Sequence, residues 1–212
     1  MPRYYPINLL LKDKRCLVIG TGGVAERKAR RLLGCGAKVL VIGPEAAPNI
    51  IALAKAKKII YKKRRFHLKD LRGAYLVIAA SSDRNINSAA FSYCRKAGIL
   101  INVVDSPGEC DFILPSIVKR GDLTITISTD GLSPALSKKI RLELEKRFGA
   151  EYAAFLRMMR KIRPEALKRL KGSRTKKIFF QTALRPGIFD LIKRHKAGEA
   201  KRRLEAILDD AA

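Results

Sequence analysis

One stretch near the start of the chain constrains its fold more than any other. An apolar run over residues 16–19 is followed at once by a glycine turn and then by a helical pattern. Gly20, Gly22 and Ala25 occupy the three small positions of the G-x-G-x-x-G/A fingerprint of dinucleotide-binding folds. Because the fingerprint lies between a predicted strand and a predicted helix, the sequence predicts a turn that binds a pyrophosphate.

Each small residue of this turn meets a separate physical demand. Gly20 allows the chain to turn sharply, Gly22 lets the backbone approach a pyrophosphate, and Ala25 lets the helix pack close to its strand. The phosphates would then lie at the helix N-terminus, where free N–H groups and the helix dipole favour an anion. The alternative is a glycine-rich turn that binds nothing.

The first half of the chain alternates strand and helix patterns. Strands are predicted at residues 16–19, 38–42, 59–61, 74–80 and 99–104, and helices from the glycine turn to about 33, at 50–56 and at 83–96. The continuous apolar run of 74–80 is typical of a central parallel strand covered on both faces. This order predicts an α/β fold, a Rossmann-like doubly wound parallel sheet.

The pattern changes after Asp105. Two strand-like runs, residues 112–119 and 123–128, flank a turn and predict a β-hairpin. Ser133 and Pro134 then have the N-cap and first-turn identities of a helix start.

The remainder is expected to be helical and strongly basic. The helix that starts at Pro134 should end near residue 148, and a second helix should cover residues 151–162 and end at Pro164. Apolar residues recur at helical spacing in the tail, and we place a domain boundary near residue 111.

The net charge of +26 limits the kinds of partner. It predicts attraction to nucleic acid, to an acidic membrane surface, or to a small molecule rich in carboxylates or phosphates. A basic bias across the proteins of the source organism would give the same charge. No apolar run approaches the roughly 20 residues that span a bilayer, and no signal-peptide pattern is present, so we expect no membrane partner and a cytoplasmic protein.

Cysteine and histidine positions do not predict a metal site. The four cysteines stand far apart without a C-x-x-C pair, which favours reduced thiols. His67 and His195 are isolated and are expected to be ordinary surface or partly buried residues.

Ligands of an open parallel sheet bind beyond the carboxyl ends of its strands, so the candidate loops are residues 20–24, 43–45, 79–83 and 105–110. The second loop departs from the usual pattern. Gly43 stands where an Asp or Glu usually holds the adenosine ribose, and the first carboxylate is Glu45. Because no arginine is found there to hold a 2′-phosphate, NAD is favoured over NADP.

Asp105 is the candidate general base. It ends an apolar strand and is expected to project into the cleft that holds the nicotinamide, where partial burial would raise its pKa. A turn or capping aspartate before Ser106 is the alternative. Ser128, Thr129 and Ser133 offer hydroxyls beside a helix N-terminus that could hold substrate carboxylates, with plain helix capping as the alternative.

Five blocks of the sequence resemble the precorrin-2 dehydrogenase family, the NAD-dependent module of siroheme synthases. They are YPINL at 5–9, VIGTGGVAERKA at 18–29, NVVD at 102–105, FILPS at 112–116 and ISTDGLSPAL at 127–136. The blocks follow the family order over residues 4–145, whereas the tail from Ala150 matches only as a helical extension.

The resemblance implies an enzyme that oxidises precorrin-2 to sirohydrochlorin and passes a hydride to NAD⁺, on the route to siroheme. Family NAD contacts fall on Gly23, Val24, Pro44 and Glu45, and the essential aspartate falls on Asp105. The expected cofactor-binding residues are therefore Gly20, Thr21, Gly22, Gly23, Val24, Pro44, Glu45, Ala80 and Ser81, and the expected substrate-binding residues are Ser128, Thr129 and Ser133. The family's phosphorylatable serine is replaced by Thr129.

The resemblance also implies a homodimer whose hairpin and following helix interlock between subunits. We therefore expect an NAD-binding Rossmann domain at 1–110, a dimerisation segment at 111–148 and a basic helical C-terminal domain at 149–212. A basic cleft suits the polycarboxylate tetrapyrrole substrate.

Two alternatives stay open at this point. Some family members also insert Fe²⁺ into sirohydrochlorin, so a bifunctional dehydrogenase and ferrochelatase is one alternative. A non-catalytic nucleotide-sensing or nucleic-acid-binding module is the other. No helix-turn-helix or aromatic stacking pattern stands out in the tail, so nucleic acid is not expected as a partner.

Overall fold

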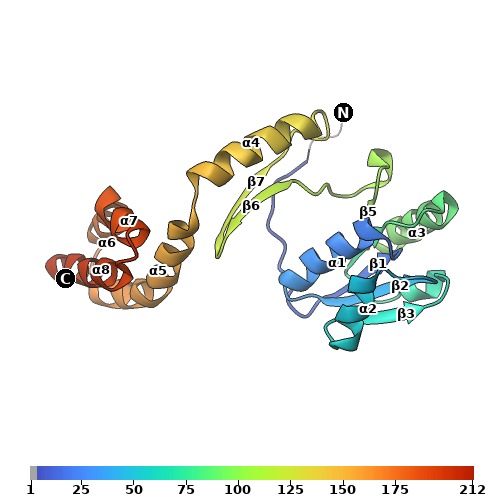
Figure 1. Ribbon diagram of the computed structural model, residues 1–212, viewed down its shortest axis with the longest axis horizontal. Helices are drawn as coiled ribbons and strands as arrows, with labels where there is room; N and C mark the ends of the chain where they lie inside the picture. The colour runs from blue at the N-terminus through green and yellow to red at the C-terminus, as the bar shows by residue number, and fades with distance from the viewer. Residues whose placement is uncertain (1–3) are drawn as a thin grey trace. The chain divides into compact units, whose positions relative to one another are not determined.

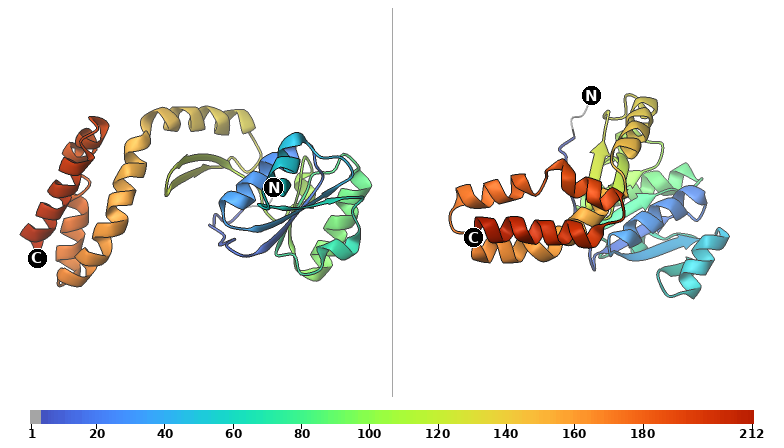
Figure 2. Two further views of the ribbon diagram at one scale, coloured as in Figure 1. Left: turned by 60° about the horizontal axis from the view of Figure 1, so that its bottom comes forward. Right: turned by 60° about the vertical axis from the view of Figure 1, so that its left-hand side comes forward.

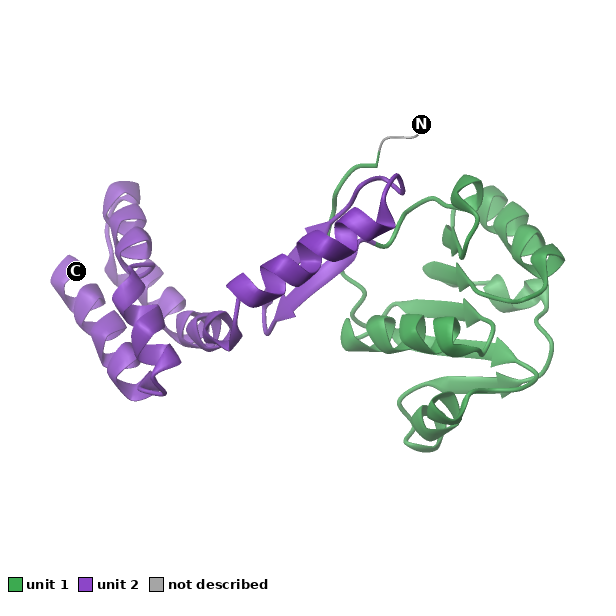
Figure 3. Cartoon of the chain, turned by 45° about the horizontal axis from the view of Figure 1, so that its top comes forward, with its two compact units in different colours: residues 1–114 green, residues 115–212 purple. Residues whose placement is uncertain are grey.

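The computed structural model describes residues 4–212 and divides the chain into two compact units, residues 1–114 and 115–212 (Figures 1 and 3). The division falls between Leu114 and Pro115. None of the helices in the described part of the chain is long and apolar enough to cross a membrane.

The first unit is a five-stranded parallel sheet with helices on both faces, which confirms the predicted doubly wound fold. Its strands are β1 (Arg15–Ile19), β2 (Lys38–Gly43), β3 (Ile60–Lys63), β4 (Leu76–Ala79) and β5 (Leu100–Val103), in the order β3-β2-β1-β4-β5. Its helices are α1 (Gly23–Gly34), α2 (Pro48–Lys55) and α3 (Arg84–Ala97), with short 3-10 helices at Leu68–Leu71 and Pro107–Glu109. Figure 1 shows α1 and α2 on one face of the sheet and α3 on the other.

Alternation along the strands builds a core on each face of this sheet. In β1, Cys16 and Val18 pack in the cluster that contains residues of α1 and α2, whereas Leu17 and Ile19 pack in the cluster that contains residues of α3. All four side chains are at most 1% exposed. Burial of each large aliphatic side chain stabilises the fold by about 1.5–3 kcal/mol, which is why strands covered on both faces are continuous apolar runs.

The second unit begins with the predicted hairpin. Its strands are β6 (Ser116–Arg120) and β7 (Leu123–Ile127), which pair antiparallel. The first strand begins at Ser116 and not at Phe112 as expected. Residues 110–112 instead lie along β5, where the Asn102 side-chain amide donates to the Phe112 carbonyl at 2.9 Å.

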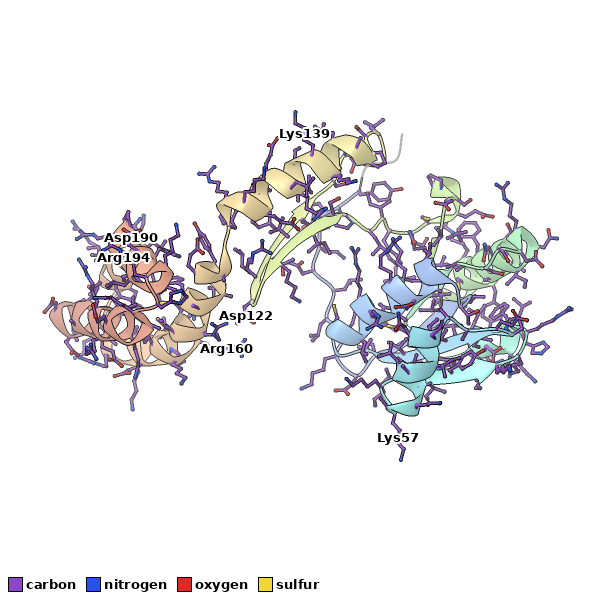
Figure 4. The ribbon with its side chains drawn as sticks, in the orientation of Figure 1. Lys57, Asp122, Lys139, Arg160, Asp190 and Arg194 are labelled. Atoms are coloured by element: carbon purple, nitrogen blue, oxygen red, sulfur yellow. The ribbon has the colours of Figure 1, made fainter. Side chains whose placement is uncertain are left out.

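Five helices follow the hairpin: α4 (Pro134–Arg147), α5 (Ala150–Arg169), α6 (Ser173–Thr182), α7 (Pro186–Lys193) and α8 (Ala197–Ala211) (Figure 2). Arg120 at the end of β6 holds the end of α4, because its guanidinium donates to the carbonyls of Glu145 at 3.0 Å and Phe148 at 2.8 Å. At the hairpin turn, Asp122 forms an ion pair of 2.6 Å with Arg160 of α5 (Figure 4).

The expected end of α5 at Pro164 is wrong, since the helix continues to Arg169. The proline lies on the exposed side, and its missing N–H and ring cost about 3 kcal/mol in a helix interior. Ile162, Ala166 and Leu170 lie on the other side, buried in one cluster with residues of α8. Each large apolar side chain contributes about 1.5–3 kcal/mol on burial, so packing on both sides of the proline offsets its cost.

Candidate active site

The order of the strands defines where a ligand can bind in the first unit. From β1 the chain proceeds outward to β2 and β3 on one side and then returns to β4 and β5 on the other. Ligands of such sheets bind beyond the carboxyl ends of the strands where the order reverses, which here is between β1 and β4. The glycine turn after β1, residues 44–47 after β2, 80–83 after β4 and 104–106 after β5 all lie at this edge.

The glycine turn has the geometry that its fingerprint demands. Gly20 has φ of +105°, and a Cβ added there would lie 2.7 Å from the carbonyl carbon of Ala80. By contrast, a Cβ added at Gly22 or Gly23 would meet no atom within 4 Å. The N-cap of α1 is Gly22, which offers no side chain to the first-turn N–H groups. Space and free donors at the N-terminus of α1 therefore fit a pyrophosphate.

Thr21 turns its side chain away from this open space. It is 8% exposed, and its hydroxyl donates to the carbonyl of Glu45. A Cβ added at Gly43 would lie 2.6 Å from the Thr21 methyl carbon, so the last position of β2 has no room for a side chain. Pro44 and Glu45 are exposed at the edge of the sheet.

The loop after β4 is held by a residue that the sequence analysis missed. Asn87 of α3 is buried, accepts from the Ser81 N–H at 3.2 Å and donates to the Ser81 carbonyl at 2.9 Å. The loop thereby keeps Ala80 and Ser81 at the edge beside the glycine turn. An amide on the apolar face of a predicted helix, at the spacing of Ala90 and Cys94, is the sequence signal that would have identified Asn87.

Asp105 lies two residues beyond Val103, the last residue of β5. Its side chain is exposed, so the expected partial burial is not found. Its φ of +60° is uncommon for a residue other than glycine. The chain reverses here and runs back beside β5, where the Asp111 N–H donates to the Ile101 carbonyl at 2.8 Å. Asp105 therefore lies at the tip of a turn at the ligand-binding edge.

Lys28 of α1 is a second group that the sequence analysis missed. Burial, followed by the positive charges of Arg31 and Arg27, lowers the pKa of its ammonium, and the carboxylate of Asp105 opposes this shift. Among the charges that act on Lys28, the Asp105 carboxylate is one that favours the cationic form. A lysine in the second turn of α1 offers a proton donor or a positive charge near the glycine turn.

The three hydroxyls expected to bind substrate lie in the second unit and make local hydrogen bonds. Ser133 caps α4 by accepting from the Leu136 N–H at 3.2 Å. The Thr129 hydroxyl accepts from the Ser133 N–H and donates to its carbonyl, each at 3.1 Å. Ser128 donates to the carboxylate of Asp130 at 3.2 Å. These contacts match the alternative interpretation, in which the hydroxyls serve to cap the start of α4.

Across residues 4–212, no group of three or more His, Cys, Asp or Glu side chains is arranged to hold a metal ion. All four cysteines are free thiols, and burial raises the pKa of Cys16 and of Cys94 to about 11. His67 and His195 are exposed.

Comparison with known proteins yields two matching family models. Residues 7–116 match the family described as "Putative NAD(P)-binding", and residues 120–147 match the family described as "Sirohaem biosynthesis protein central". The siroheme synthase of Nitrosococcus oceani is 35% identical over 207 residues, which is 98% of this chain and 44% of that protein. The siroheme synthase of Methylococcus capsulatus is 35% identical over 99% of this chain and 44% of its own length. The chain thus spans less than half the length of these curated relatives.

One solved structure has the same fold over nearly the whole chain. It is titled "SirC, precorrin-2 dehydrogenase", and it aligns with a TM-score of 0.78, 24% sequence identity, and coverage of 96% of this chain and 100% of its own. The glycine turn and the five-stranded sheet fall within the first matched segment, and β7 and α4 fall within the second. The first family model matches more than half of the chain, so the chain belongs to the family described as "Putative NAD(P)-binding".

Proposed function

We propose that the protein is an NAD-dependent precorrin-2 dehydrogenase that oxidises precorrin-2 to sirohydrochlorin in siroheme biosynthesis. The observation that carries the proposal is the joining of an NAD(P)-binding domain to a sirohaem-biosynthesis central segment in one chain, with Asp105 at the ligand-binding edge. The SirC fold and the siroheme synthase relatives support the same activity.

The edge of the sheet offers a place for each part of the cofactor. Gly20, Gly22 and the N-terminus of α1 would hold the pyrophosphate, and Glu45 would face the adenosine ribose on the β2 side. The nicotinamide would then lie on the side of β4 and β5, beside Ser81 and Asp105. Gly23, Val24, Pro44, Ala80 and Thr21 complete the proposed cofactor-binding set.

The reaction removes a hydride and a proton from precorrin-2. NAD⁺ supplies the hydride acceptor, so the protein must receive the proton. Asp105, exposed at the tip of its turn, is the proposed acceptor, and such a base contributes on the order of 10²–10⁴-fold. The Lys28 cation of α1 favours a substrate rich in carboxylates.

The proposal includes a homodimer and a cytoplasmic location. Three leucines at the start and along α4 are exposed in the single chain: Leu132 by 68%, Leu136 by 48% and Leu142 by 44%. Burial of these side chains against a second copy would stabilise a dimer.

The same proposal includes two further roles. Residues 111–148 would form the dimerisation segment, and Ser128, Thr129 and Ser133 would bind substrate. Fractionation of the producing cells tests the location.

The function is tested by incubating the protein anaerobically with precorrin-2 and NAD⁺ and monitoring the absorbance of the two products. We expect sirohydrochlorin and NADH to appear together in equal amounts. Asp105→Ala should abolish turnover and leave NADH binding near its wild-type value, because the side chain lies outside the glycine turn. If neither product appears with the wild-type protein, the proposal is wrong. Sirohydrochlorin with Fe²⁺ and no NAD⁺ tests the ferrochelatase alternative.

A further inference from the structure

The end of β2 differs from the usual dinucleotide site in a way that the structure explains. In that site an acidic side chain at the end of the second strand binds the ribose hydroxyls. Here the position is Gly43, and an added Cβ would lie 2.6 Å from the methyl carbon and 2.7 Å from the hydroxyl oxygen of Thr21. The Thr21 side chain occupies the space that an acidic side chain at this position would need.

Thr21 also fastens the loop that carries the nearest carboxylate. Its hydroxyl donates to the carbonyl of Glu45, and its own carbonyl accepts from the Ala47 N–H at 3.1 Å. On the other side of the same loop, the Tyr61 hydroxyl donates to the Gly43 carbonyl at 3.0 Å. Glu45 lies two residues beyond the end of β2, and burial followed by the Glu45 carboxylate raises the pKa of Tyr61.

We propose that Thr21 is a positioning residue for cofactor choice, which closes the usual acidic position at Gly43 and holds the loop so that Glu45 takes over recognition of the adenosine ribose. This inference rests on the NAD binding in the proposed function. A carboxylate held there accepts hydrogen bonds from ribose hydroxyls and repels a 2′-phosphate.

Because of the neighbouring strand β3, the position of Glu45 determines the choice between NAD and NADP. β3 ends in Lys62 and Lys63, and the register places Lys63 beside Gly43. A cationic strand end favours the 2′-phosphate of NADP, and the Glu45 carboxylate opposes it. Loss of the Thr21 hydroxyl would release the backbone carbonyl of Glu45, and with it the loop that positions the carboxylate, while both lysines stay in place. The preference for NAD should therefore fall.

The test measures the binding of NADH and of NADPH to the full chain through the change in their fluorescence. Thr21→Val keeps the shape of the side chain and removes the hydroxyl, whereas Thr21→Ser keeps the hydroxyl. We expect Thr21→Val to weaken NADH binding about 3- to 10-fold and to lower the NADH-over-NADPH preference by a similar factor, because one hydrogen bond is lost. Thr21→Ser should retain the wild-type preference. Thr175→Val on α6 is the matched control and should change neither affinity.

A wild-type preference in a folded Thr21→Val protein would overturn the inference, and so would an equal loss in Thr21→Ser. If Thr21→Val does not fold, Glu45→Gln is the variant to test. It should also lower the NADH-over-NADPH preference. An unchanged preference in Glu45→Gln would refute the assignment. These measurements need no tetrapyrrole. Failure of precorrin-2 turnover with normal NADH binding would therefore count against the proposed function alone.

Discussion

The hydroxyl of Ser88 on α3 donates a hydrogen bond of 2.8 Å to the carboxylate of Glu109. The second oxygen of that carboxylate accepts from the Ser106 hydroxyl at 3.0 Å. Glu109 therefore connects a helix of the sheet layer to the turn that begins at Asp105. Because Asp105 has a left-handed backbone conformation, which costs about 1–2 kcal/mol for a residue other than glycine, its turn needs such support.

We predict that Glu109→Ala lowers the kcat of the proposed dehydrogenase by on the order of 10-fold or more, since a small displacement of a catalytic group is costly. The KM for NAD⁺ should stay near its wild-type value. Glu109→Gln should retain most of kcat, because its amide can accept from one serine hydroxyl and donate to the other. Steady-state kinetics of the two variants check this, and a wild-type kcat in Glu109→Ala would contradict it.

Gly20→Ala should abolish NADH binding and destabilise the first unit. The substitution combines φ of +105° with a Cβ placed 2.7 Å from the Ala80 carbonyl carbon, and strained backbone alone costs on the order of 1–3 kcal/mol. Gly98→Ala is the control, since Gly98 has φ of +65° with open space around an added Cβ. It should cost about 1 kcal/mol and leave NADH affinity unchanged. Urea denaturation and NADH titration distinguish the two outcomes.

Acid should remove the contribution of Asp70 to stability. Its carboxylate accepts two hydrogen bonds from the Arg64 guanidinium, at 2.6 and 2.8 Å, and these hold the pKa of Asp70 at about 2, below its ordinary value of 3.8. The stabilisation is therefore complete above about pH 4 and is lost as the pH falls through about 2.

Asp70→Asn should accordingly lower the free energy of unfolding by about 1–2 kcal/mol at pH 7, and the difference from wild type should shrink towards pH 2. Asp122→Asn removes an exposed ion pair with Arg160 and should change stability by less than about 1 kcal/mol at either pH. Urea unfolding across this pH range is the measurement. A difference for Asp70→Asn that is constant with pH would refute the assignment.

Leu136→Glu should convert the proposed dimer into a monomer, because it places a charge on an apolar face that a second copy would bury. Leu167→Glu is the matched control, since Leu167 on α5 is also exposed, by 39%. Size-exclusion chromatography with light scattering reports the mass of each variant. The dimer interface lies elsewhere if Leu136→Glu retains the wild-type mass, or if both variants lose it equally.

Local chemistry determined much of this fold. The apolar runs of β1, β4 and β5 identified buried parallel strands, and Ser133 with Pro134 marked the start of α4. Gly98 marked the end of α3, where it has the left-handed conformation that glycine adopts most readily. The glycine turn located the cofactor edge for the same reason, since backbone conformation and helix polarity depend on neighbouring residues in the chain.

The tertiary structure alone decided what surrounds those elements. α5 continues through Pro164 because side chains on both sides of the proline pack against α8. Asp105 is exposed because the chain reverses beside β5 and returns along it. The pairs Ser88 with Glu109 and Thr21 with Gly43 join residues more than 20 positions apart, and strand register and helix packing bring them together. The glycine turn and its edge therefore followed from the sequence, whereas the contacts that hold Glu45 and Asp105 at that edge depend on long-range packing that no local pattern encodes.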